Sequence, residues 1–125
     1  MPLDWTLDPD SRLMVAVATG DVTRREVETY LDAIIANGAL AYRKVFDASQ
    51  GDTSMTAEDI LPLAVRMRSF HDLGQMGPLA IILPPGRGKR LHRAVGILAV
   101  AERPMRIFDD PARAYRWVAK QIMPE

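Results

Sequence analysis

Short apolar runs alternate along this chain with amphipathic stretches of helical period, and this order constrains the fold more than any other feature. Between the runs, apolar residues recur every three or four positions, as in helices with one buried face. Strands that alternate with helices predict a mostly parallel sheet with right-handed crossovers. The runs predicted as strands are 5–7, 13–18, 43–48, 79–83 and 105–108.

Most of the predicted helices begin or end at a recognisable capping signal. Thr23 and Glu26 have the spacing of a capping box, in which two side chains satisfy free backbone amides. Thr56 precedes a helix whose acidic first turn suits the helix dipole, and Asp110-Pro111 opens the last helix. The four apolar stripes are Val27, Tyr30, Leu31, Ile34 and Ile35; Ile60, Leu63, Ala64, Met67 and Phe70; Leu91, Ala94, Val95, Leu98 and Ala99; and Ala114, Tyr115, Val118 and Ile122.

These elements predict a single α/β domain over residues 1–125, in the order ββαβαβαβα. We expect a mixed, mostly parallel five-stranded sheet with about four helices. The run 79–83 is wholly apolar, as in a central strand buried on both faces. The run 5–7 precedes turn residues and predicts an antiparallel edge strand beside 13–18. Gly20-Asp21 is expected to end that second strand, and 49–54 is expected to form a polar loop.

Composition excludes several classes of protein. The 125 residues include no cysteine, so disulfides, Cys-based zinc sites and thiol nucleophiles are excluded. Sixteen basic residues balance sixteen acidic ones, which argues against a general nucleic-acid binder. No apolar run approaches the roughly 18 residues of a membrane span, and the N-terminus lacks the basic and apolar blocks of a signal peptide. We therefore expect a cytoplasmic protein with no nucleic-acid partner and no membrane span.

The chain carries no recognisable catalytic or metal-binding motif. The two histidines, His71 and His92, lie 21 positions apart, and neither has a second ligand at helical spacing. The G-x-S-x-G sequence of a serine hydrolase is absent. We therefore expect no enzymatic activity, no metal and no cofactor.

Three segments carry a resemblance to a known family. Gly20-Asp21-Val22-Thr23 opens a helix, Val45-Phe46-Asp47 ends a strand, and Ile107-Phe108-Asp109 precedes Ala114 and Trp117. With the order of elements, they resemble the STAS superfamily, the domain of sulphate transporters and anti-sigma-factor antagonists. The layout is most similar to small stand-alone bacterial members. The resemblance implies the sporulation anti-sigma-factor-antagonist-like fold and a non-enzymatic regulatory domain that binds a protein partner.

The same resemblance implies a regulatory loop at Asp47, Ser49, Thr53, Ser54 and Thr56. In phosphorylated members a Ser at a helix N-terminus follows an Asp-containing turn, and here Thr56 lies nine positions after Asp47. Met55 stands where those members have Asp, and Glu58 stands where they have Gly. We therefore expect Thr56 to cap its helix without carrying a phosphate, and the loop to serve an unphosphorylated partner or a ligand.

A basic loop is the second candidate site. Gly86, Arg87, Gly88, Lys89 and Arg90 follow the apolar run 79–83. Glycine lets the backbone approach a ligand, and amides together with cations suit a phosphate or a carboxylate. The spacing is not that of a phosphate-binding P-loop, because Arg90 stands where Ser or Thr is required. The simpler interpretation is a solvated basic loop.

Two functions of different class stay open from the sequence. The first is a regulatory or protein-interaction domain whose partner is not identified. The alternative is a binding module for a small apolar, lipid-like or anionic ligand. Met55, Met67, Met76 and Met105 supply adaptable apolar surface for either a partner groove or a ligand pocket. The predicted edge strand 5–7 also makes a homodimer a candidate assembly, because an exposed edge can pair with a second chain.

We predict weak, salt-sensitive anion binding at the basic loop, because amides and cations converge there. Titration with phosphate or sulphate, followed by NMR, should shift the Gly86 and Gly88 amide resonances and leave those of Gly20 and Gly38 in place. Unmoved Gly86 and Gly88 resonances at millimolar anion would contradict the prediction.

Overall fold

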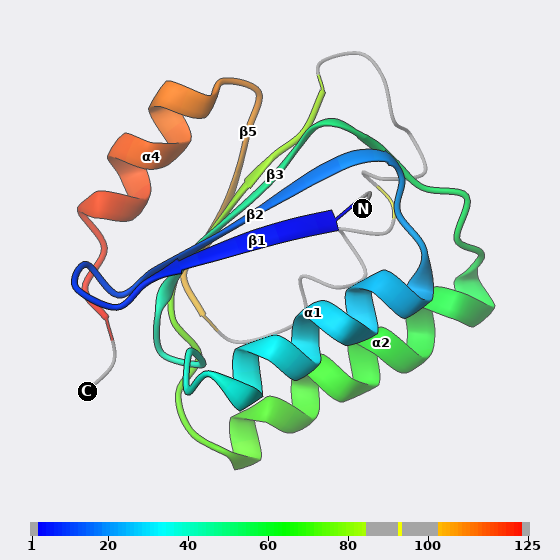
Figure 1. Cartoon of the computed structure of the whole chain (residues 1–125), viewed down its shortest axis with the longest axis horizontal. Helices are drawn as coiled ribbons and strands as arrows, with labels where there is room; N and C mark the ends of the chain where they lie inside the picture. Colours follow the sequence, from blue (N-terminus) through cyan, green and yellow to red (C-terminus); the bar gives the residue numbers. More distant parts are fainter. Residues whose placement is uncertain (1–2, 85–92, 94–102, 124–125) are drawn as a thin grey trace.

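A twisted five-stranded sheet organises the part of the chain that the computed structural model describes, residues 3–84, 93 and 103–123 (Figure 1). Neighbouring strands follow the order β1-β2-β3-β4-β5; β1 is antiparallel to β2 and the other pairs are parallel. The predicted mixed sheet with an antiparallel edge strand is therefore confirmed. The strands are β1 (Leu3–Asp8), β2 (Leu13–Asp21), β3 (Arg43–Asp52), β4 (Leu79–Ile82) and β5 (Met105–Phe108).

Helices cover both faces of this sheet, α1 and α2 on one face and α4 on the other (Figure 1). Thr23 and Glu26 form the predicted capping box: the Glu26 amide donates to Thr23 Oγ1 over 3.3 Å, and the Thr23 amide donates to Glu26 Oε1 over 3.0 Å. Asp110 caps α4 by accepting from the Ala112 amide over 3.2 Å. The helices described are α1 (Arg24–Ala36), α2 (Ala57–Ser69) and α4 (Pro111–Ala119), with a 3-10 turn, η1, at Phe70–Asp72.

Side chains alternate between the two faces along the inner strands. Val45 on β3 and Ala80 and Ile82 on β4 pack with Ala114 and Val118 of α4. Their neighbours Phe46, Leu79 and Ile81 belong to the larger core beneath α1 and α2. The period of two places every second residue of β3 under the helix pair.

An arginine joins α1 to α2. One guanidinium nitrogen of Arg66 donates to the Glu28 carbonyl over 3.2 Å, and another pairs with the Asp32 carboxylate. The guanidinium also lies 5.7 Å from the ring centroid of Phe70. These contacts hold the two helices together as one layer over the sheet.

Two boundaries differ from the sequence prediction. Gly20 and Asp21 are the last two residues of β2 and do not break the strand after residue 18, and residues 49–52 belong to β3 and not to a loop. The register shifts between Val17 and Thr19, after which Thr19 pairs with Gln50 and Asp21 with Asp52. At this shift Ala48 and Ser49 of β3 lie opposite Ala18 alone, which is the pattern of a bulge in β3, and the pairing resumes beyond it.

The apolar run 79–83 supplies β4, whose four residues are all buried. It is an inner strand, but β3 occupies the middle position of the sheet. Three α-helices lie in the described ranges, against about four predicted. The predicted helix over Leu91, Ala94, Val95, Leu98 and Ala99 lies outside the residues that the structure describes.

Candidate functional site

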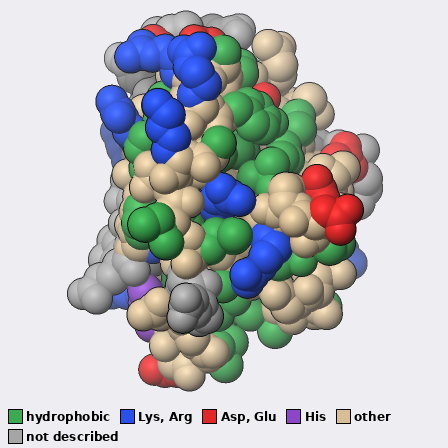
Figure 2. All heavy atoms as spheres, turned by 90° about the vertical axis from the view of Figure 1, so that its left-hand side faces the viewer, with side chains coloured by type: hydrophobic (Ala, Val, Ile, Leu, Met, Phe, Trp, Pro, Cys, Tyr) green, Lys and Arg blue, Asp and Glu red, His purple; other side chains and the backbone are tan. Residues whose placement is uncertain are grey.

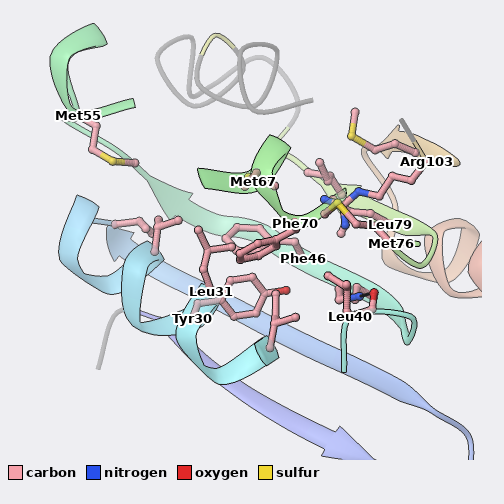
Figure 3. A pocket seen from close by; sticks show the side chains of 16 residues that line it. Tyr30, Leu31, Leu40, Phe46, Met55, Met67, Phe70, Met76, Leu79 and Arg103 are labelled. Carbon is pink, nitrogen blue, oxygen red and sulfur yellow. Dashed lines mark hydrogen bonds between the residues drawn. The ribbon is translucent and has the colours of Figure 1, made fainter. Parts of the chain in front are cut away.

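A cavity of about 90 Å³ lies between the sheet and the helices α1 and α2 (Figure 3). Its wall is almost entirely apolar. Tyr30 and Leu31 come from α1, Phe46 from β3, and Phe70 from η1. The Tyr30 ring packs edge-on against Trp5 and Phe46, with ring centroids 5.7 Å and 5.8 Å apart. These ring contacts hold the aromatic side chains in fixed positions in the cavity wall.

Lys44 brings an amine into this apolar surrounding. Its side chain is 1% exposed, because Lys44 lies two positions before Phe46 and shares its face of β3. The Nζ atom donates to the Leu40 carbonyl over 2.7 Å and to the Tyr42 carbonyl over 2.9 Å. Burial, helped by the positive charge of Arg103, lowers the pKa of Lys44 to about 7.

Arg103, just before β5, is the second cation that lines the cavity. Its Nε atom is buried and has no hydrogen-bond partner among the described residues. Burial lowers the pKa of Arg103, and Tyr30 opposes that change. Burial also raises the pKa of Tyr30 to about 12, so the phenol stays neutral. Among the described residues that line the cavity there is no carboxylate, so neither cation has an acidic partner there.

Arg103 marks one end of the cavity. In Figure 3, Arg103 lies at the opposite end from Met55. A wider surface groove of about 600 Å³ shares Met76 and Arg103 with the cavity. The rest of the groove is lined by His71, Gly74, Gln75, Pro78, Pro104, Ile122 and Met123. Arg103 is thus positioned between the apolar interior and a solvent-facing surface.

The structure divides the regulatory loop predicted from the sequence. Asp47 and Ser49 lie within β3, where Asp47 Oδ1 accepts from the Ser49 amide over 3.0 Å and from its hydroxyl over 2.6 Å. Burial, and secondly the charge of Asp47, raises the pKa of Tyr115 on α4. Asp47 therefore lies on the α4 side, and the strand from Asp47 to Asp52 spans about 16 Å.

Thr53, Ser54 and Thr56 lie apart from that pair, where β3 leads into α2. Thr53 is buried; its hydroxyl donates to the Val22 carbonyl over 2.7 Å and accepts from the Met55 amide over 3.1 Å. The Ser54 amide and hydroxyl donate to the Asp21 carboxylate over 2.7 Å and 3.1 Å. These two hydroxyls join the connection to the end of β2.

Thr56 is the N-cap residue of α2. Its amide and its hydroxyl both donate to Asp59 Oδ2, over 3.0 Å and 3.1 Å. The hydroxyl therefore donates to the Asp59 carboxylate at its own helix start, and the same carboxylate satisfies the Thr56 amide, as one half of a capping box does. That Thr56 acts only as a cap stays a prediction.

The basic loop at Gly86, Arg87, Gly88, Lys89 and Arg90 lies outside the described residues. Within the described ranges, no three His, Asp or Glu side chains are grouped so that they could hold a metal ion. No helix in those ranges is long and apolar enough to cross a membrane.

Lys44 and Arg103 were missed by the sequence reasoning, which gave the cavity no cation. A signal for Lys44 was present: it stands two positions before Phe46 in a predicted inner strand, so its side chain must share the covered face. No such signal marks Arg103, because its position depends on contacts far apart in the sequence. The methionines were found, since Met55, Met67, Met76 and Met105 all line the cavity.

Comparison with known proteins identifies the fold. No protein-family model and no curated protein matches the chain. A solved structure of an uncharacterised DUF3478-family protein from Shewanella loihica, described as having a SpoIIAA-like fold, is similar at a TM-score of 0.59 and 17% identity. The match covers 93% of this chain and 91% of the other. This chain therefore has the SpoIIAA-like, STAS-like fold that the resemblance implied.

Thr53 should matter more for stability than Thr56. Thr53→Val leaves the Val22 carbonyl and the Met55 amide unpaired, at a cost of about 1–3 kcal/mol. Thr56→Ala should cost about 1 kcal/mol and Thr56→Ser almost nothing. Urea unfolding measures all three variants. A smaller loss of unfolding free energy for Thr53→Val than for Thr56→Ala would contradict this order. A Thr56→Ala variant that keeps its stability but no longer binds a native partner would instead support a phosphorylation switch at Thr56.

Stability should also depend on pH through Lys44. Unfolded Lys44 keeps its proton to about pH 10, whereas in the folded chain it loses the proton near pH 7. Between these values the unfolded state binds more protons, so the free energy of unfolding rises with pH, by up to about 1.4 kcal/mol per pH unit. Above pH 10 the raised pKa of Tyr30 acts in the opposite direction.

The pH dependence is measured by urea unfolding at several values from pH 7 to pH 9. The wild type should gain about 2–3 kcal/mol relative to Lys44→Met over this interval. Lys120→Met, which removes an exposed lysine, is the matched control and should follow the wild type. Parallel curves for the wild type and Lys44→Met would show that Lys44 titrates normally.

Proposed function

We propose that this domain binds a small apolar ligand in the cavity between the sheet and the helices α1 and α2. The observation that carries the proposal is the cavity itself. Folded interiors are close-packed and hold few voids larger than a water molecule. A void of about 90 Å³ would cost about 2 kcal/mol if left empty. A ligand that fills it recovers this free energy by restoring the missing contacts.

The wall is suited to ligands of more than one shape. Met55, Met67, Met76 and Met105 come from four different segments and reach the same cavity. Methionine is unbranched and polarizable, so its side chain adapts to irregular surfaces. Tyr30 and Phe46 line the same cavity, and their rings pack against each other with centroids 5.8 Å apart. This combination supports binding of apolar groups that differ in shape.

A protein-interaction function, which the STAS resemblance favours, is the second candidate. The observation in its favour is a basic face on α4, where Lys and Arg side chains gather (Figure 2). Arg113, Arg116 and Lys120 are exposed on this helix, and Tyr115 is 39% exposed among them. By charge complementarity the face fits an acidic protein segment. It lies across the sheet from the cavity, so the two functions can be separated by substitution.

Ligand binding should be visible at the methionine methyl groups. With 1-hexanol as the probe, NMR of methyl-labelled protein should show shifts for Met55, Met67, Met76 and Met105. Met14 is an internal control, because it is buried but does not line the cavity. At ten times its dissociation constant the probe should stabilise the fold by about 1.4 kcal/mol, which raises Tm by roughly 5 °C at this length.

Matched leucine variants locate the binding. Leu31→Phe adds bulk within the cavity and should weaken or abolish both effects, whereas Leu61→Phe makes the same change on an exposed face of α2 and should not. The double variant Arg113→Glu/Arg116→Glu should bind the probe normally. Absent methionine shifts over the series from 1-butanol to 1-octanol would refute ligand binding at this cavity.

A further inference from the structure

We propose that Lys44 and Arg103 form an anion-binding end of the cavity, and that the ligand is a short-chain monocarboxylic acid whose carboxylate lies between them. This inference rests on the proposed function and names the chemistry of its ligand. It starts from two cationic side chains that line one small, otherwise apolar space.

The first argument is the missing counter-charge. A buried cation is costly unless it is paired and hydrogen-bonded. Within the described lining, Lys44, Arg103 and Tyr30 are the titratable groups, and none of them is acidic in the neutral pH range. The electrostatic influence on the pKa of Lys44 comes from Arg103, and that on the pKa of Arg103 comes from Tyr30. An anion supplied by a ligand would pair both cations at once.

The second argument is the unused donor. Lys44 already donates to the Leu40 and Tyr42 carbonyls, and a protonated amine has a third N–H beyond those two bonds. The Arg103 Nε–H is buried with no partner among the described residues. A carboxylate has two oxygens with in-plane acceptor sites, which match an arginine fork. A phosphate dianion brings more charge and three acceptor oxygens, which two cations would leave only partly paired.

The third argument is placement. Arg103 is shared by the cavity and by the surface groove that contains Gly74, Gln75 and Pro104. An acid oriented with its carboxylate at Arg103 therefore has its charged end nearest to water and its chain directed along the apolar wall toward Met55 (Figure 3). The cavity volume of about 90 Å³ is smaller than the roughly 150 Å³ that encloses benzene, so the cavity holds only a short alkyl chain and the carboxylate lies outside it, at the groove end.

Hexanoate and 1-hexanol test the inference, because they share a chain and differ in charge. At pH 6 the wild type should bind hexanoate about tenfold or more tightly than 1-hexanol, measured by calorimetry. Arg103→Met should remove that preference and leave 1-hexanol binding within about twofold, since it replaces the cation by an uncharged, unbranched side chain. Arg106→Met, an exposed arginine on β5, is the matched control and should behave as the wild type.

A pH series gives a readout that a merely structural role for the cations would not produce. Hexanoate stays ionised from pH 6 to pH 9. Its affinity should fall above about pH 7, as Lys44 loses its proton, whereas 1-hexanol affinity should stay constant. Lys44→Met should remove the pH dependence of hexanoate binding; if that variant does not fold, Arg103→Met and the wild-type pH series decide the question.

The outcomes separate the two proposals. Equal binding of hexanoate and 1-hexanol, with shifts at the cavity methionines, would overturn the anionic end and leave apolar binding intact. Tighter binding of hexyl phosphate than of hexanoate would overturn the choice of a carboxylate. Binding of neither probe would overturn the cavity as a ligand site, and the inference with it.

Discussion

Backbone packing around Leu40 fixes the geometry on which the cavity depends. The Leu40 carbonyl accepts from the Gly77 amide over 2.9 Å and from Lys44 Nζ over 2.7 Å. At Gly77 a Cβ atom would lie 2.0 Å from the Tyr42 carbonyl oxygen, so no other residue fits there without a backbone shift. The segment between α1 and β3 therefore contacts the segment before β4 through backbone atoms. The Lys44 amine bonds to two carbonyls of the first segment, those of Leu40 and Tyr42.

The two faces of the sheet are packed by side chains of different size. On the α4 face, small and branched side chains such as Ala80, Val45 and Ala114 bring helix and sheet close together. On the other face, Tyr30, Phe46 and the methionines hold α1 and α2 over a space that they do not fill. The ligand space lies on the face where long and aromatic side chains line it without filling it.

The parts of the fold that could be predicted from the sequence are those set by local chemistry. Thr23 with Glu26, and Asp110 with Pro111, specify helix starts within a few residues, and the alternating runs specify the strands. The extension of β3 through Gln50 and Gly51 could not be predicted, because it follows a register shift in the pairing of β3 with β2. Its polar side chains have the pattern of a loop, and pairing with a distant strand overrides that pattern.

The candidate site was harder to predict, for a physical reason. Four methionines could be singled out as adaptable apolar surface, but their meeting point depends on how four segments pack. The position of Lys44 two residues before Phe46 places it on the covered face of β3, but its place in a cavity depends on how the helices cross over that strand. Arg103 and Lys44 lie 59 positions apart in the sequence. Charged sites assembled from residues so far apart in the sequence have no characteristic spacing that a sequence motif could reveal.

The lowered pKa of Lys44 connects the stability of the fold to its capacity for a ligand. A pKa near 7 allows the empty cavity to keep a neutral amine, which avoids most of the cost of a buried charge. Approach of an anion favours the protonated amine and draws a proton into the site, so binding and protonation reinforce one another. Arg103 has no such freedom, because a guanidinium stays charged in proteins. The pair therefore combines Arg103, which stays charged, with Lys44, which takes up a proton when an anion binds. This arrangement suits reversible binding of an anionic ligand.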